Sequence, residues 1–205
     1  LVVGCSPAGA MRRKHGRVLY INNKGSGIVA MSQILFWYAS HHGQTRKILE
    51  HMGRMVPQAQ IEWCLLSERP SRPLVEYDHV LLAAPIRYGY FHASLRQVIR
   101  EHHAVLRQVQ AGFVGVCLTA RKPENNRPET NLYMRKWLLR SPWQPSACAV
   151  FAGAVRYSRC TRWQRWMIRL IMWMTQGHTD VRSDREYTDW MQVDAFARQF
   201  FQQSA

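Results

Sequence analysis

Short apolar segments alternate with helical patterns from residue 34 to the end of the chain. Each apolar segment is short enough for a strand, and each intervening stretch repeats apolar residues every three to four positions, as a helix does. Five strands are predicted, at residues 34–38, 60–66, 79–84, 113–119 and 147–155. Helices are predicted at residues 45–56, 94–106, 129–140 and 188–201. Strands that alternate with helices and are apolar throughout predict an α/β, doubly wound parallel sheet covered on both faces.

Two helix starts carry a local signal. Ser94 and Gln97 have the spacing of a capping box and predict that the second helix begins there. Thr188 precedes the apolar face of the last helix and predicts that helix's start.

A small polar turn links the first strand to the first helix. Its residues are Ser40, His41, His42, Gly43, Gln44 and Thr45. The first N–H groups of a helix lack backbone partners and favour negative charge, so such a turn can bind a phosphate. Its spacing matches neither the dinucleotide fingerprint nor the P-loop. An ordinary connection between a strand and a helix remains the alternative.

Two further loops follow predicted strands, at residues 85–92 and 119–123. Ligands of doubly wound sheets bind at the carboxyl ends of the strands, near the point where the strand order reverses. All three loops are expected at that edge, and we expect a ligand site there.

Several segments resemble a known family, the quinone-dependent protoporphyrinogen IX dehydrogenases of bacteria, which have the flavodoxin fold. The segments that carry the resemblance are Ile34-Leu35-Phe36, Gly43-Gln44-Thr45, Ile86-Arg87-Tyr88-Gly89, Ala120-Arg121-Lys122-Pro123-Glu124, Ala152-Gly153-Ala154, Met167-Ile168, Leu170-Ile171-Met172 and Tyr187-Thr188-Asp189-Trp190. They occur in order over nearly the whole chain after Met31. The resemblance implies a flavodoxin-like five-stranded sheet of order 2-1-3-4-5, with an insertion before the final helix.

The resemblance also implies a cofactor and a reaction. FMN would be bound, and protoporphyrinogen IX would be oxidised to protoporphyrin IX with menaquinone or ubiquinone as electron acceptor, a step of haem synthesis. The turn at 40–45 would hold the phosphate. Ile86, Arg87, Tyr88 and Gly89 would flank the isoalloxazine, with Thr119, Ala120, Arg121 and Lys122 on its other side.

Arg87 and Arg121 are the candidates for contact with the substrate's propionates, because guanidinium groups bind carboxylates bidentately. The alternative is that each pairs with the flavin phosphate or with a local carboxylate.

No catalytic acid or base is assigned, and no metal is expected. His92, His102 and His103 are weak candidates, and His102 falls on an apolar helix face where a structural histidine is expected.

The length of 205 residues predicts one domain, at residues 31–205, after a leader at residues 1–30. The leader lacks any apolar period, and we expect it to be disordered or an upstream extension. Without it the net charge falls from +15 to +10, because 23 basic and 13 acidic residues remain. Such a basic domain is expected to meet an anionic partner.

The five cysteines are widely spaced and predict reduced thiols.

The insertion, at about residues 156–186, predicts a basic amphipathic helix. Its candidate membrane contacts are Arg162, Trp163, Arg165, Trp166, Arg169 and Leu170. A helix rich in Trp with an Arg face is typical of a membrane interface, so we expect a peripheral protein on the cytoplasmic face of the inner membrane, bound to an anionic surface. A helix packed on the protein's own core or on a dimer partner is the alternative. Nucleic acid is not expected as a partner.

Two other functions stay open. One is an NAD(P)H:quinone reductase of the flavodoxin fold, which hydride transfer from NADPH would identify. The other is a non-enzymatic flavodoxin electron carrier, although such carriers are typically acidic. The sequence predicts neither the oligomeric state nor the preferred quinone.

Overall fold

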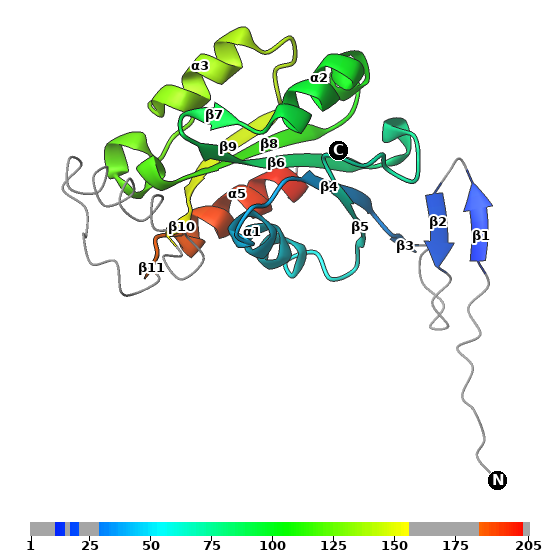
Figure 1. The fold of residues 1–205 in the computed structure, drawn as a ribbon. Coiled ribbons are helices and arrows are strands. Elements are labelled where there is room, and N and C mark those ends of the chain that lie inside the picture. The colour runs from blue at the N-terminus through cyan, green and yellow to red at the C-terminus, as the bar shows by residue number, and fades with distance from the viewer. Residues whose placement is uncertain (1–10, 15–16, 21–28, 156–184, 203–205) are drawn as a thin grey trace.

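A five-stranded parallel sheet forms the centre of the computed structural model, which describes residues 11–14, 17–20, 29–155 and 185–202 (Figure 1). Its strands are β4 (Gln33–Tyr38), β5 (Gln60–Leu65), β6 (His79–Arg87), β8 (Ala111–Cys117) and β9 (Ala147–Ala152). They lie in the order β5-β4-β6-β8-β9, all parallel. The expected order 2-1-3-4-5 is confirmed.

Burial explains why the strands differ in pattern. All six residues of β4 are buried, because β4 lies between β5 and β6 and has helices on both faces. β5 is an edge strand, and its Trp63 and Leu65 are 38% and 39% exposed, while Cys64 is buried. A continuous apolar segment therefore marks an inner strand, and an alternating one marks the edge.

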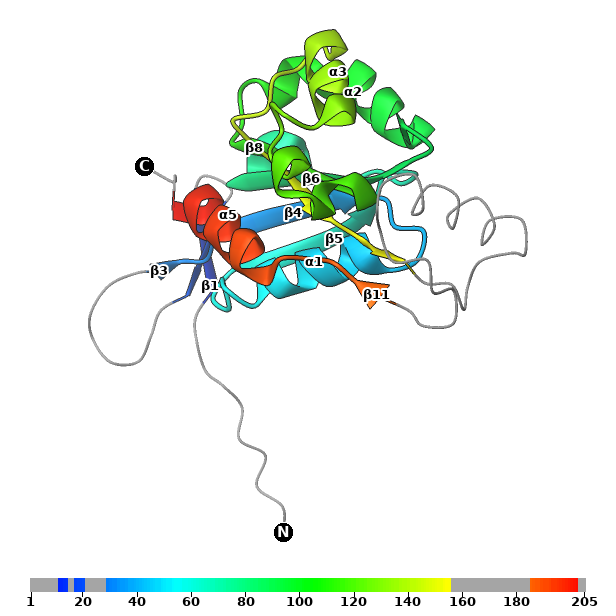
Figure 2. The same cartoon turned by 90° about the vertical axis from the view of Figure 1, so that its left-hand side faces the viewer.

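Within the described residues, α-helices cover both faces of the sheet (Figures 1 and 2). They are α1 (Gln44–Gly53), α2 (Ala93–Leu106), α3 (Leu132–Arg140) and α5 (Trp190–Gln202). The buried residues of α1 and α5 share one core cluster, and those of α2 and α3 share the other. This division is the doubly wound arrangement.

Both predicted helix starts are corrected by the structure. α2 begins at Ala93 and not with a capping box at Ser94, because the His92 imidazole accepts the Ser94 backbone N–H at 3.3 Å. The Asp189 carboxylate accepts backbone N–H groups at the start of α5, so Asp189 and not Thr188 occupies the capping position. A histidine cap has no common sequence signature, and Thr188 is used elsewhere.

The described part of the leader contains three short strands. They are β1 (Met11–Lys14), β2 (Arg17–Tyr20) and β3 (Val29–Ala30), paired antiparallel in a sheet of their own. These parts of the leader are therefore extended and paired. The domain boundary at residue 31 remains a prediction.

Most of the insertion, residues 156–184, lies outside the described residues. Its two ends are joined by an antiparallel pair of short strands, β10 (Ala154–Val155) and β11 (Arg185–Glu186). The six candidate membrane contacts are therefore not described. Within the described residues, every helix is too short or too polar to cross a membrane.

The three described cysteines, Cys64, Cys117 and Cys148, are free thiols, as expected. Burial raises the pKa of Cys64 to about 11 and that of Cys148 to about 12. Both thiols therefore stay protonated at neutral pH and are poor nucleophiles.

His79 at the start of β6 makes stability depend on pH. The residue is 2% exposed and packs against the rings of Phe200 and Phe201. Burial lowers the pKa of His79, and Asp78 only partly opposes this. Below the ordinary histidine pKa the unfolded chain binds more protons, so the free energy of unfolding should fall as pH drops through that value. Urea unfolding at pH 7.5 and pH 5 measures this slope, and His79→Phe should make it shallower. An unchanged slope in this variant would assign the pH dependence to other groups.

Candidate cofactor-binding cleft at the carboxyl edge of the sheet

The connection between β4 and α1 forms an open helix N-terminus. Gly43 precedes the helix with φ of 86° and ψ of −9°, a left-handed conformation that glycine adopts without strain. Its carbonyl accepts the Lys47 N–H at 2.9 Å, and no side chain caps the helix. The first turn of α1 contains no acidic residue. Backbone N–H groups are therefore free to bind an anion at this end of the sheet.

Ser40 carries an orphaned polar atom in this turn. Its hydroxyl oxygen is buried and has no hydrogen-bond partner among the described residues. Thr45, in the first turn of α1, is only 2% exposed. Burying a hydroxyl without a partner is costly, so the site fits an external group that accepts hydrogen bonds. A phosphate has this property.

Gln44 connects this turn to the far strand of the sheet. Its amide nitrogen donates to Thr188 Oγ1 at 2.9 Å, and that hydroxyl donates to the Ala152 carbonyl at 2.8 Å. The amide oxygen of Gln44 is buried without a partner among the described residues. Gln44 therefore positions the turn, a role that the sequence does not distinguish from the phosphate binding predicted for all six residues of the turn.

A cleft of about 350 Å³ separates the turn from the β6–β7 hairpin, where β7 is Tyr90–Phe91. The residues that line it are Ala39, Ser40, His41, Pro85, Arg87, Tyr90, Phe91 and His92. The first two predicted loops therefore meet at one cavity. His92 was only a weak sequence candidate, yet it lines this cavity.

The cleft is electropositive. Burial lowers the pKa of His41, and the nearby Arg87 and His92 lower it further. Three basic side chains thus share a small volume, and no ion pair of Arg87 is found within the described residues. An anion in the cleft would favour the protonated form of His41 and would be attracted by all three groups.

The β6–β7 hairpin turns sharply at Tyr88 and Gly89. Both have positive φ, 51° and 85°, and the flanking Arg87 and Tyr90 pair across the hairpin. Two positive φ angles in a two-residue loop match the twist of a β-hairpin. Tyr88 is the only non-glycine residue with positive φ in the described part of the chain, a strained conformation that functional sites often hold.

The aromatic side chains of this hairpin are exposed. Tyr88 is 58% and Tyr90 76% exposed, and the Arg87 guanidinium lies 5.5 Å from the centre of the Tyr88 ring. Ile86 is 9% exposed and packs in the core beneath α2 and α3. Tyr88 therefore presents a largely exposed ring next to Arg87, which lines the cleft, while Ile86 can reach a ligand only through its backbone.

The third predicted loop forms a short 3-10 helix, Leu118–Arg121, and lies outside the lining of the cleft. Arg121 donates to the Leu118 carbonyl at 3.3 Å, and Lys122 pairs with Glu124 at 3.8 Å. Ala120 is buried. Arg121 and Lys122 are thus engaged locally, and of the two candidate substrate arginines Arg87 is the one that lines the cleft.

Asn131 holds the third loop in place, a role that sequence reasoning missed. It is fully buried, and its amide nitrogen donates to Thr119 Oγ1 at 3.3 Å and to the Asn125 carbonyl at 3.0 Å. Its amide oxygen accepts the N–H groups of Tyr133 and Met134 and so caps α3. The helix therefore begins at Leu132 and not at 129. An Asn before an apolar helical period is an N-cap signal that could have revealed it.

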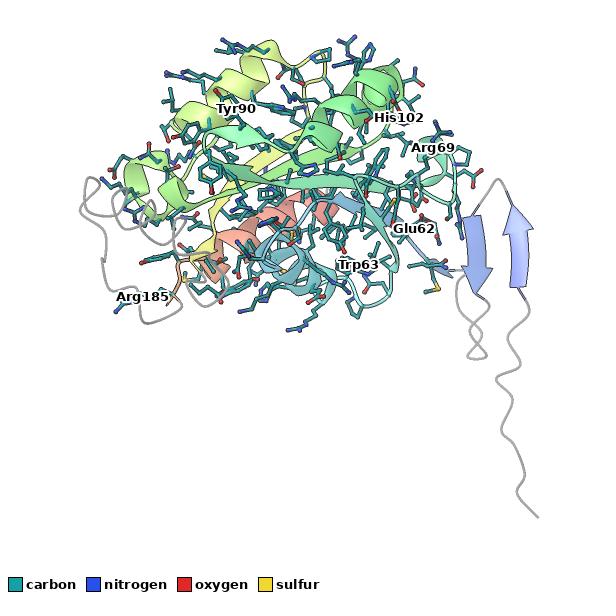
Figure 3. All side chains as sticks on the ribbon, viewed as in Figure 1. Glu62, Trp63, Arg69, Tyr90, His102 and Arg185 are labelled. Carbon is teal, nitrogen blue, oxygen red and sulfur yellow. The ribbon has the colours of Figure 1, made fainter. Side chains whose placement is uncertain are left out.

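His102 and His103 lie away from this cleft. His102 is on α2 with its ring 5.3 Å from Trp37, and it lines a different surface cavity with Arg69 and Arg72. Figure 3 shows His102 and Tyr90 well separated along the molecule. His102 is thus a structural histidine at the edge of the core, as expected. The described residues contain no cluster of side chains that could hold a metal ion.

Comparison with known proteins assigns this arrangement to a family. A model of the flavodoxin domain matches residues 35–182. Protoporphyrinogen IX dehydrogenase [quinone] of Escherichia coli strain K12 is 41% identical over 167 residues, which cover 80% of this chain and 92% of that protein. The protein of the same name from Leishmania major is 37% identical over 81% of this chain and 73% of its own length.

Among solved structures, oxidised Flavodoxin 1 from Bacillus cereus matches 85% of this chain and all of its own chain, with 14% identity and a TM-score of 0.49. The domain match and the level of identity to the dehydrogenases agree with the parallel sheet and its cleft. The chain therefore belongs to the flavodoxin-domain family, and within it to the quinone-dependent protoporphyrinogen IX dehydrogenases.

Proposed function

We propose that the protein is an FMN-dependent enzyme that oxidises protoporphyrinogen IX to protoporphyrin IX and passes the electrons to menaquinone or ubiquinone. The observation that carries the proposal is the 41% identity to the Escherichia coli dehydrogenase over nearly that protein's whole length. The cleft supports it independently, because it pairs an open helix N-terminus with a buried hydroxyl that lacks a partner.

The residues of the cleft fit FMN. The Gly43 turn, the Ser40 hydroxyl and the first N–H groups of α1 would hold the terminal phosphate. Tyr88 offers an exposed ring on which a planar heterocycle could stack. Bound FMN would supply two-electron chemistry between the porphyrinogen and the quinone.

The remaining basic side chains suit the substrate. Protoporphyrinogen IX carries propionates, and Arg87, His41 and His92 lie together at the cleft. The Arg87 guanidinium can donate charge-assisted hydrogen bonds to a carboxylate, and a neutral imidazole can donate one from its ring N–H, which would orient the ring system against the cofactor. The role of these residues is binding and orientation, and the proposal assigns no proton transfer.

Turnover of the purified, FMN-loaded protein tests the function. Under anaerobic conditions, protoporphyrinogen IX with a quinone should yield fluorescent protoporphyrin IX, and omission of either the protein or the quinone should stop product formation. NADPH should not replace the porphyrinogen as electron donor. Quinone reduction by NADPH without porphyrinogen oxidation would favour the quinone reductase instead, and one-electron cycling with neither activity would favour an electron carrier.

Ser40→Ala and Thr45→Ala test the phosphate site. Each should weaken FMN binding by roughly 1–3 kcal/mol, because a charged acceptor loses a donor. Ser40→Ala should leave the unfolding free energy of the FMN-free protein unchanged or higher, since the hydroxyl has no partner there within the described residues. Titration of flavin fluorescence measures both affinities. Riboflavin, which lacks the phosphate, is the control, and an equal loss with riboflavin would contradict the phosphate assignment.

Arg87→Met and Arg121→Met test the substrate contacts. Arg87 lines the cleft, whereas Arg121 donates to the Leu118 carbonyl. Arg87→Met should therefore raise the KM for protoporphyrinogen about tenfold or more, the loss expected for one charge-assisted pair, while the KM for quinone stays unchanged. Arg121→Met should have the smaller effect. Reduced flavin occupancy with an unchanged substrate KM would instead assign Arg87 to the cofactor.

We also propose that the protein acts at the cytoplasmic face of the inner membrane, because quinone and porphyrinogen are lipid-soluble. The sequence of residues 162–174 supports this with Arg162, Arg165 and Arg169 at helical spacing among Trp residues. Replacing all three with Glu should lower activity with a long-chain quinone in membranes and spare activity with a short, water-soluble quinone. Steady-state rates with both quinones check this, and equal loss with both would point to a structural role for the segment.

A further inference from the structure

The outer face of α3 exposes apolar and basic side chains together. The exposed residues, spaced as one helical face, are Leu132, Arg135, Lys136, Leu139 and Arg140. Leu132 is 45% and Leu139 79% exposed. The opposite face is anchored, because Met134 is fully buried and the Trp137 ring stacks on Phe113 with 4.3 Å between centroids. The exposed face is therefore presented by a firmly packed helix.

This face carries an excess of positive charge. α3 has three basic residues and no acidic one. The neighbouring α2, which covers the same side of the sheet (Figures 1 and 3), exposes Arg96 and Arg100, and its Glu101 already accepts a hydrogen bond from Gln97 at 2.9 Å. Within the described residues, the structure gives no ion pair to Arg96, Arg100, Arg135, Lys136 or Arg140.

We propose that this α3 face, with Arg96 and Arg100 of α2, docks on an anionic phospholipid surface. Cations that lack carboxylate partners attract lipid headgroups, and the two leucines among them can enter the boundary between headgroups and acyl chains. A nucleic acid would bind the same cations, but exposed leucines among them would add nothing to its binding.

α3 also contacts two loops at the carboxyl edge of the sheet, one of which is the turn of the hairpin that borders the cleft. Its cap, Asn131, holds Thr119 of the third loop. The ring of Tyr133 lies 3.1 Å from the position that a Cβ on Gly89 would occupy, and so packs against the turn of the β6–β7 hairpin. A membrane bound to α3 would therefore contact the helix that packs against the β6–β7 hairpin, and this hairpin borders the cleft.

Vesicle binding by the full, FMN-loaded chain tests the proposal. Arg135→Glu with Arg140→Glu should lower affinity for phosphatidylglycerol-containing vesicles by about tenfold or more. The matched control is Arg54→Glu with Arg198→Glu, which changes the net charge equally on the exposed surface of α1 and α5 and should have little effect. Equal losses in both variants would show attraction by net charge alone and would overturn the α3 assignment, as would unchanged binding in the first variant.

Leu139→Gln distinguishes binding to a lipid surface from binding to other anions. At 79% exposure its replacement should not affect folding, which bound flavin and circular dichroism will verify. The variant should bind the same vesicles several-fold more weakly and should bind duplex DNA as the parent does. Unchanged vesicle binding by Leu139→Gln, or charge-reversal effects seen only with DNA, would contradict a membrane surface.

Discussion

The position of β4 determines most of what this molecule can do. β4 pairs in parallel with β5 on one side and β6 on the other. The connection after β4 leads to α1 on one face of the sheet, and the connection after β6 leads to α2 on the opposite face (Figure 2). The two connections diverge and leave a crevice that no backbone fills. The cleft, the open N-terminus of α1 and the Tyr88 turn all border that divergence.

Electrostatics then select what enters the crevice. Several features of the crevice favour an anion. They are the first N–H groups of α1, the Ser40 hydroxyl without a described partner, and the basic side chains of Arg87, His41 and His92. FMN and a tetrapyrrole with propionates are both large and anionic, so one cleft edge can serve both. The proposed docking of α3 follows the same reasoning, since α3 packs against the hairpin and exposes cations that have no ion pair within the described part of the chain.

The fold was predictable because inner parallel strands must be apolar throughout. Residues 34–38 and 79–84 have this pattern, and the candidate cleft lies at the carboxyl ends of the strands that they form. Several contacts were not predictable, because they join residues far apart in the chain. Asn131 bonds to Thr119, and Gln44 to Thr188, through side chains whose partners depend on the sheet order. The His92 cap was missed since histidine rarely caps helices. Tyr88 was named from a resemblance, but its positive φ emerges only from the hairpin register.

The most direct test is a single-turnover experiment on the purified chain with one equivalent of bound flavin. Anaerobic addition of protoporphyrinogen IX should bleach the visible flavin absorbance, because the porphyrinogen passes one electron pair to the flavin. Subsequent addition of menaquinone should restore the absorbance, and three or more equivalents of menaquinone should yield protoporphyrin IX, since its formation removes six electrons in three pairs. Heat-released cofactor should be FMN. Bleaching by NADPH but not by protoporphyrinogen IX, or a protein that binds no flavin, would contradict the account.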